Sequence, residues 1–96
     1  MGLSIYVMNL SRKRVEMFTD DADDSFCRMC QKAPDASLRH GVSKYWDTMF
    51  NTPQLYRFTE ELESPPSDQV TPVIKQILET ARVTIRNSGY LYFVGN

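Results

Sequence analysis

The sequence has few of the residues that build reactive or cross-linked sites. Its 96 residues include two cysteines and one histidine. Cys27 and Cys30 lie three positions apart, and a secreted domain held by disulfides would need more cysteines, farther apart. A zinc site usually needs a second cysteine pair or histidine partners. We therefore expect no catalytic site, no metal and no cofactor, and we do not expect the chain to be an enzyme.

The chain also lacks long apolar runs and a charge excess of one sign. No stretch approaches the ~20 apolar residues of a membrane-spanning helix, and the first ten residues lack the basic region of a secretory signal. Eleven basic and twelve acidic residues give a net charge of −1, whereas nucleic-acid binders usually carry a basic excess. These absences predict a cytoplasmic protein and argue against a membrane or a nucleic acid as its partner.

What is present suits one small globular domain covering residues 1–96. Hydrophobic residues make up 42% of the chain, and five Phe, five Tyr and one Trp are available to fill a core. A domain of this size buries roughly two-thirds of its unfolded surface, so it can fold alone around a compact core.

Strands are expected near both ends of the chain. Residues 3–10 are apolar on both faces, which is typical of a central strand. Tyr90–Val94 is an apolar terminal strand that must be buried beside a partner, and residues 3–10 are the obvious one. Residues 14–18 are predicted to form the second strand of a hairpin, with the start of a helix as the alternative.

Helical spacing or capping signals occur in four segments: residues 20–32, 37–50, 53–63 and 72–86. Thr19 or Asp20 could cap the first, and Pro53 and Pro72 suit the first position of the last two. In the last segment, residues 83–85 could instead pair with Tyr90–Val94 as a hairpin. The predicted fold is α+β, with three to four helices packed on a two- or three-stranded sheet that pairs the N-terminal and C-terminal strands.

The C-x-x-C motif and the single histidine have structural explanations. Redox chemistry needs the cysteine pair at the start of a helix, just after a strand, where the dipole lowers the thiol pKa. Cys27 and Cys30 lie in the middle of the predicted helix, so we interpret them as small buried residues. No nucleophile motif accompanies His40, which we expect to be exposed or to cap a helix.

The densest charges are acidic. A calcium loop would need carboxylates at alternate positions, followed by a glycine and a glutamate at fixed distances, and the spacing here is wrong. One interpretation is a helix N-terminus stabilised by its dipole, and the other is a docking surface for a basic partner. On the second interpretation, the candidate partner-binding residues are Asp20, Asp21, Asp23, Asp24, Glu60, Glu61 and Glu63.

Two other segments have a possible nucleic-acid interpretation. The basic turn at residues 12–14 could touch phosphate, but such turns are usually only solvated. The aromatic run at residues 90–93 could stack on bases if it lay on an open sheet face. Because we place no basic residues beside it, we expect this run to pack in the core.

The layout resembles that of small bacterial immunity proteins of the contact-dependent inhibition type. The resemblance rests on the short chain, the acidic clusters, and a helix followed by the terminal strand Tyr90–Val94. Barstar-type ribonuclease inhibitors have a similar order of elements, and residues 45–49 (YWDTM) are faintly similar in character. The resemblance implies a tight protein inhibitor with an acidic face, and it assigns no site residue.

The sequence therefore predicts a small protein-binding module. Most concretely, we expect an immunity or inhibitor protein whose carboxylates cover the basic active site of a toxin, in particular a nuclease. The alternative is a small cytosolic regulatory or thiol-containing protein.

Overall fold

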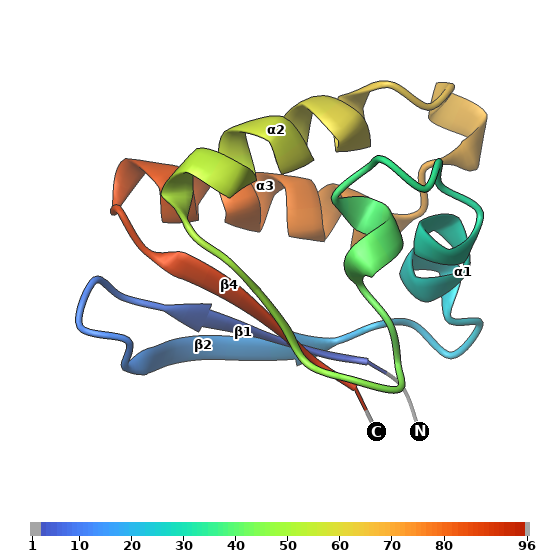
Figure 1. The fold of residues 1–96 in the computed structure, drawn as a ribbon. Helices are drawn as coiled ribbons and strands as arrows, with labels where there is room; N and C mark the ends of the chain where they lie inside the picture. The colour runs from blue at the N-terminus through green and yellow to red at the C-terminus, as the bar shows by residue number, and fades with distance from the viewer. Residues whose placement is uncertain (1–2, 96) are drawn as a thin grey trace.

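The computed structural model describes residues 3–95. Over this range the fold is α+β, as the sequence predicts, with three α-helices on one side of a four-stranded antiparallel sheet (Figure 1). The helices are α1 (Ser25–Gln31), α2 (Thr52–Glu63) and α3 (Pro72–Arg86). Two short 3₁₀ turns, η1 (Arg39–Gly41) and η2 (Ser67–Gln69), lie in the connections. None of the helices in residues 3–95 is long and apolar enough to cross a membrane.

The sheet has the strand order β2-β1-β4-β3. Its strands are β1 (Ser4–Met8), β2 (Arg14–Thr19), β3 (Thr48–Phe50) and β4 (Tyr90–Val94). The N-terminal and C-terminal strands pair at the centre, with Ile5 opposite Phe93, as predicted. The hairpin prediction is also confirmed, because β2 pairs with β1. The prediction allowed two or three strands, whereas the sheet has four. The additional strand is β3, which pairs with β4 at the edge of the sheet.

Helix α1 begins later than the sequence suggests. The prediction placed its start at Asp20, whereas the observed N-cap is Asp24, which has a left-handed φ of 54°. A residue in that conformation cannot continue a right-handed helix, so residues 20–24 form a loop. The side chain of Asp20 still serves the helix, because it accepts hydrogen bonds from the backbone N–H groups of Phe26 and Cys27.

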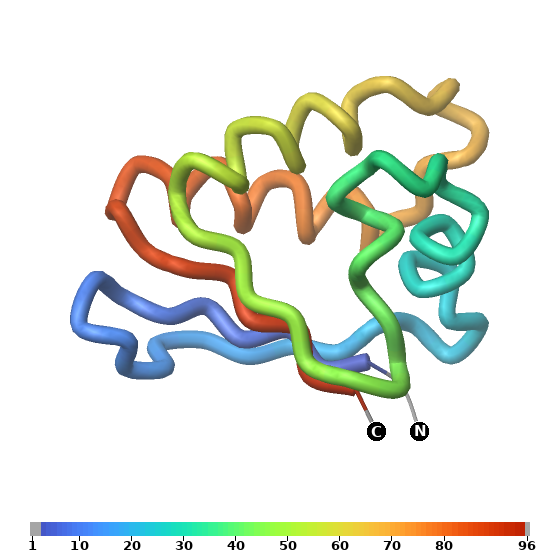
Figure 2. Tube along the Cα trace, in the orientation of Figure 1, coloured from blue at the N-terminus to red at the C-terminus, as the bar shows by residue number. Residues whose placement is uncertain are grey.

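The predicted helix over residues 37–50 is wrong. The chain makes only the short turn η1 and then descends from the helical layer to the edge of the sheet, where β3 pairs with β4 (Figure 2). The apolar spacing that suggested a helix includes Tyr45 and Trp46, and both side chains are exposed. Pairing with β4 places Phe50 in the core, and this tertiary contact outweighs the local helical pattern.

The last two helices agree closely with the prediction. Asn51 caps α2 in a reciprocal capping box with Gln54, and Pro53 lies in the first turn of the helix. In α3, Val73, Ile74 and Ile77 face the core. The alternative hairpin around residues 87–89 is excluded, since α3 continues to Arg86.

The core lies between the helices and the inner face of the sheet. Its centre is a cluster of four phenylalanine rings: Phe26, Phe50, Phe58 and Phe93. The ring centroids of Phe26 and Phe93 are 5.5 Å apart, and those of Phe50 and Phe58 are 5.0 Å apart. Leu3 and Ile5 of the N-terminal segment are fully buried beside them. All three helices therefore cover the same face of the sheet, which leaves the other face without a layer of secondary structure within residues 3–95.

Candidate functional site

The strand register divides the C-terminal aromatic run between the two faces of the sheet. Leu91 and Phe93 are fully buried in the core, whereas Tyr90 and Tyr92 point to the opposite side and are partly exposed. Successive side chains of a strand alternate between the faces. The expectation that residues 90–93 pack in the core is thus correct for Leu91 and Phe93 and wrong for the two tyrosines.

We call the uncovered side the outer sheet face. Register with Tyr92 places Tyr6 and Met49 on this side, and register with Tyr6 adds Met17. Met17 and the bulge residue Val15 are 54% and 61% exposed, which is unusual for apolar residues of a strand. The outer sheet face comprises Tyr6, Val15, Met17, Met49, Tyr90, Tyr92 and Val94; Met8 points to the same side but is buried.

Arginines from the β1–β2 turn lie over two of the tyrosines. The guanidinium carbon of Arg14 is 4.2 Å from the ring centroid of Tyr6, and that of Arg12 is 5.5 Å from the centroid of Tyr90. Both distances suit cation–π contacts, which hold the charge against the ring while leaving guanidinium N–H groups for other acceptors. The basic residues 12–14 therefore border the outer sheet face.

Hydrogen bonds fix Tyr92 at the centre of this face. Its hydroxyl donates to Oδ2 of Asp47 at 2.9 Å, and the backbone N–H of Gly95 donates to the other carboxylate oxygen at 3.2 Å. The bond to Asp47 raises the pKa of Tyr92 above its usual value. The ring of Tyr6 lies beside it, with the centroids 6.4 Å apart. Tyr6 and Tyr92 thus lie side by side on the outer sheet face, and a hydrogen bond to Asp47 orients Tyr92.

The charges near the outer sheet face are mainly positive. Arg12, Lys13 and Arg14 occupy one end, and Asp47 already accepts the two hydrogen bonds described above. Glu16 pairs with Val7, so its side chain starts on the opposite side of the sheet. An apolar, aromatic surface with cations at one end is suited to a partner that presents apolar side chains next to carboxylates.

Two of the four aspartates in residues 20–24, Asp20 and Asp21, bind backbone groups of the protein itself. Asp20 is buried and accepts backbone hydrogen bonds from Asp21, Phe26 and Cys27. Burial raises its pKa, although the three hydrogen bonds oppose that effect. Asp21 accepts hydrogen bonds from the hydroxyl and the N–H of Ser25, and these bonds lower its pKa. Together the two carboxylates cap the first turn of α1, as the helix-terminus interpretation expects.

In the second acidic stretch, residues 60–63, two of the three glutamates form ion pairs. Glu61 accepts hydrogen bonds from the backbone N–H groups of Leu38 and Arg39, pairs with the Arg39 guanidinium at 3.2 Å and lies 3.6 Å from that of Arg57. Glu63 pairs with Arg82, and the bond raises the pKa of that arginine. These two carboxylates hold the 37–41 segment and α3 against α2.

Three of the seven candidate carboxylates are not bound within residues 3–95: neither a salt bridge nor a side-chain hydrogen bond forms at Asp23, Asp24 or Glu60. Asp23 and Asp24 lie in the loop that leads into α1, whereas Glu60 lies in the last turn of α2. The two acidic stretches therefore occupy different parts of the fold. Their role in partner binding stays a prediction.

The cysteines and the histidine lie away from the outer sheet face. Cys27 and Cys30 are buried as free thiols, and burial raises the pKa of both. A thiol with a raised pKa is a poor nucleophile at neutral pH, so the two residues fit the structural interpretation. His40 is exposed, with Nε2 3.5 Å from Oδ1 of Asp35 at the surface.

Comparisons with protein-family models, with curated proteins and with solved structures found no match to this chain. The candidate site therefore rests on the geometry alone. The sequence patterns did not indicate the outer sheet face as a site. The one available signal is that Val15 and Met17 alternate with charged residues, as in a strand with one apolar face. Only the placement of all three helices on the other side leaves these residues exposed.

Proposed function

We propose that this chain is a protein-binding module that docks its partner on the outer sheet face. The observation behind the proposal is a sheet face on which Val15, Met17 and Met49 are exposed beside three partly exposed tyrosines, and which no helix within residues 3–95 covers. Exposed apolar and aromatic side chains of this kind are enriched in the centres of protein interfaces.

The partner that fits is a protein surface with apolar side chains flanked by carboxylates. Arg12 and Arg14 lie over Tyr90 and Tyr6, so each guanidinium favours a position beside the tyrosines before binding. Preorganised guanidinium groups lose less conformational entropy when they bind a carboxylate. Charge complementarity at this end would steer the approach, and the tyrosines and methionines would supply the buried area.

The same arginines argue against single-stranded nucleic acid as the main ligand. Base stacking needs an accessible aromatic face, and an arginine occupies one face of Tyr6 and another lies over Tyr90. Met17, Val15 and Met49 add aliphatic surface, which packs against protein side chains better than it stacks on bases. A protein surface with carboxylates would complement the arginines, and its apolar side chains would pack against the methionines and Val15.

The toxin-inhibitor role expected from the acidic stretches remains a separate proposal. It now depends on the carboxylates that do not serve the fold, Asp23 and Asp24 in the loop before α1 and Glu60 on α2. Reversing the charge of Asp23 and Asp24 together should leave docking on the outer sheet face unchanged, because this loop lies outside that face.

A titration followed by the backbone amide signals in NMR tests the docking proposal. The probe is a short synthetic peptide in which Phe and Leu alternate with Glu. We expect the shifted signals to lie in β1, β2 and β4, and we expect Arg14→Glu to weaken binding about tenfold, since a charge-assisted contact is typically worth ~1.5 kcal/mol or more. Lys75→Glu, on the exposed side of α3, is the matched control and should bind like the unaltered protein.

Three results would overturn the proposal. The first is equal binding of a peptide with Lys in place of Glu. The second is stronger binding of oligothymidylate, which would indicate a single-stranded nucleic-acid platform. The third is a stable dimer in sedimentation that covers the outer sheet face with a second copy of the chain.

A further inference from the structure

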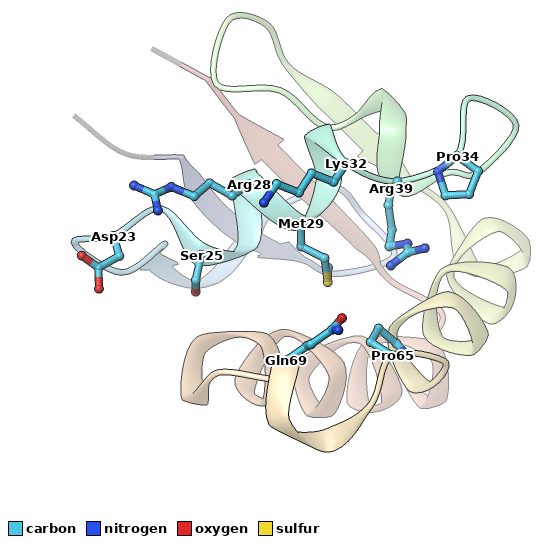
Figure 3. Close-up of a pocket in the computed structure, with 10 residues that line it drawn as sticks. Asp23, Ser25, Arg28, Met29, Lys32, Pro34, Arg39, Pro65 and Gln69 are labelled. Atoms are coloured by element: carbon cyan, nitrogen blue, oxygen red, sulfur yellow. The ribbon is translucent and has the colours of Figure 1, made fainter.

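A concave site lies on the helical side of the molecule, away from the outer sheet face. It is a pocket of about 500 Å³ between α1 and the connection from α2 to α3. This volume falls within the usual range for small-molecule sites. Figure 3 shows Met29 pointing from α1 across the pocket toward Gln69 and Pro65, with the guanidinium of Arg39 directed to the same space.

The lining of the pocket carries more positive than negative charge. Arg28, Lys32 and Arg39 line it, against the single carboxylate of Asp23. Arg28 and Lys32 extend along α1 at the rim, and neither forms an ion pair with any residue in the 3–95 range (Figure 3). A small anion entering the pocket would therefore meet two cations whose guanidinium and ammonium groups are not held in an ion pair within residues 3–95.

Arg39 gives the pocket a fixed cationic wall. Its side chain is only 12% exposed, and its Nε donates to Oε1 of Glu61 at 3.2 Å. That carboxylate also lies 3.6 Å from the Arg57 guanidinium and accepts two backbone N–H groups, so its single charge is shared between two arginines. A largely buried and only partly neutralised guanidinium is stabilised by a further anion.

The remaining wall is apolar and adaptable. Met29, Ala33, Pro34 and Pro65 contribute hydrocarbon surface, and Gln69 offers an amide that can donate or accept. The methionine thioether adjusts readily to ligands of different shape. The combination of an apolar wall with cations beside it fits a molecule with a short apolar body and one acidic head group.

We propose that this pocket binds a small organic anion, with its carboxylate or phosphate group near Arg39 and Lys32 and its apolar body against Met29 and Pro65. The site is independent of the outer sheet face, because it is built by α1 and the helical connections and contains no strand residue. A ligand here would bridge α1 to the segment between α2 and α3.

Isothermal titration calorimetry with amide-signal NMR tests this inference. The probes are 4-phenylbutyrate, phenyl phosphate, inorganic phosphate and the neutral 4-phenylbutanol. We expect saturable binding of at least one organic anion, with shifted signals in residues 28–34 and 65–69, and at least about tenfold weaker binding of the neutral alcohol. Comparison of phenylbutyrate with phenyl phosphate identifies the preferred head group.

The variant pair keeps surface charge matched. Arg28→Gln with Lys32→Gln removes two cations at the rim and leaves the Arg39–Glu61 contact in place, so the fold should be retained. We expect the anion to bind about tenfold more weakly to this variant, and normally to the control Lys75→Gln with Arg86→Gln on α3. Equal weakening in both pairs, equal binding of the alcohol, or the absence of saturable shifts at millimolar probe would each overturn the proposal.

Discussion

At the scale of single residues, Asp20 shows how a carboxylate can stabilise the fold while looking like part of a binding surface. It lies in the densest acidic run of the chain, yet its side chain is only 7% exposed relative to a free residue. It accepts N–H groups from Asp21, Phe26 and Cys27. Two of those donors belong to the first turn of α1, where intrahelical acceptors are absent. A charge run in a sequence does not reveal which of its members turn inward.

Replacing Asp20 with Ala should therefore destabilise the protein by about 3 kcal/mol, because two buried backbone donors and one part-buried donor would lose their acceptor. Asp23→Ala is the matched control and should change the free energy of unfolding by less than ~0.5 kcal/mol, since that side chain is exposed. Urea unfolding followed by circular dichroism measures both. Equal and small effects would show that Asp20 is not a structural cap.

At the scale of elements, the helix α2 and the helix α3 were readable because several local signals agree. Each has a capping residue, a proline in its first turn and apolar residues on one face. The segment over residues 37–50 had only the apolar spacing. Its conformation is decided by the exposed edge of β4, to which Thr48–Phe50 adds a strand. No pattern within the segment itself contains that information.

The junction between α3 and β4 gives a sharp test of element packing. A side chain on Gly89 would collide with the backbone carbonyl of Met8 and crowd Thr84, whereas nothing lies within 4 Å of a Cβ built on Gly41. We expect Gly89→Ala to cost at least about 2 kcal/mol, because backbone must shift at the centre of the sheet. The same change at Gly41 should be close to neutral.

Thermal unfolding of the two alanine variants compares them directly. If Gly41→Ala proved as destabilising as Gly89→Ala, the close approach of β1 to the start of β4 would be contradicted.

At the scale of the whole molecule, the sequence predicted the α+β class, the pairing of the terminal strands and the β1–β2 hairpin. It did not predict the candidate site, because the outer sheet face is exposed only as a result of all three helices packing on the other face. Tyr90 and Tyr92 look like core residues until the helices are all placed on the other side of the sheet. Likewise, the contacts of Arg12 and Arg14 with the tyrosines depend on the turn that folds them back over β1 and β4.

The two proposed sites differ in shape and in the chemistry of the ligand that each would bind. The outer sheet face is broad, aromatic and edged by cations, which suits a protein partner, whereas the pocket beside α1 is concave and suits a small anion. Because they share no residue, a variant of one should leave binding at the other unchanged.

The most direct measurement of the central claim compares Met17→Glu with Val83→Glu in binding to the Glu-containing Phe/Leu peptide. Both residues are exposed and apolar, but Met17 lies on the outer sheet face and Val83 on α3. We predict that Met17→Glu weakens binding by at least about tenfold, through lost apolar contact and like-charge repulsion, and that Val83→Glu changes it less than about twofold. Equal affinities for the two variants would contradict docking on the outer sheet face.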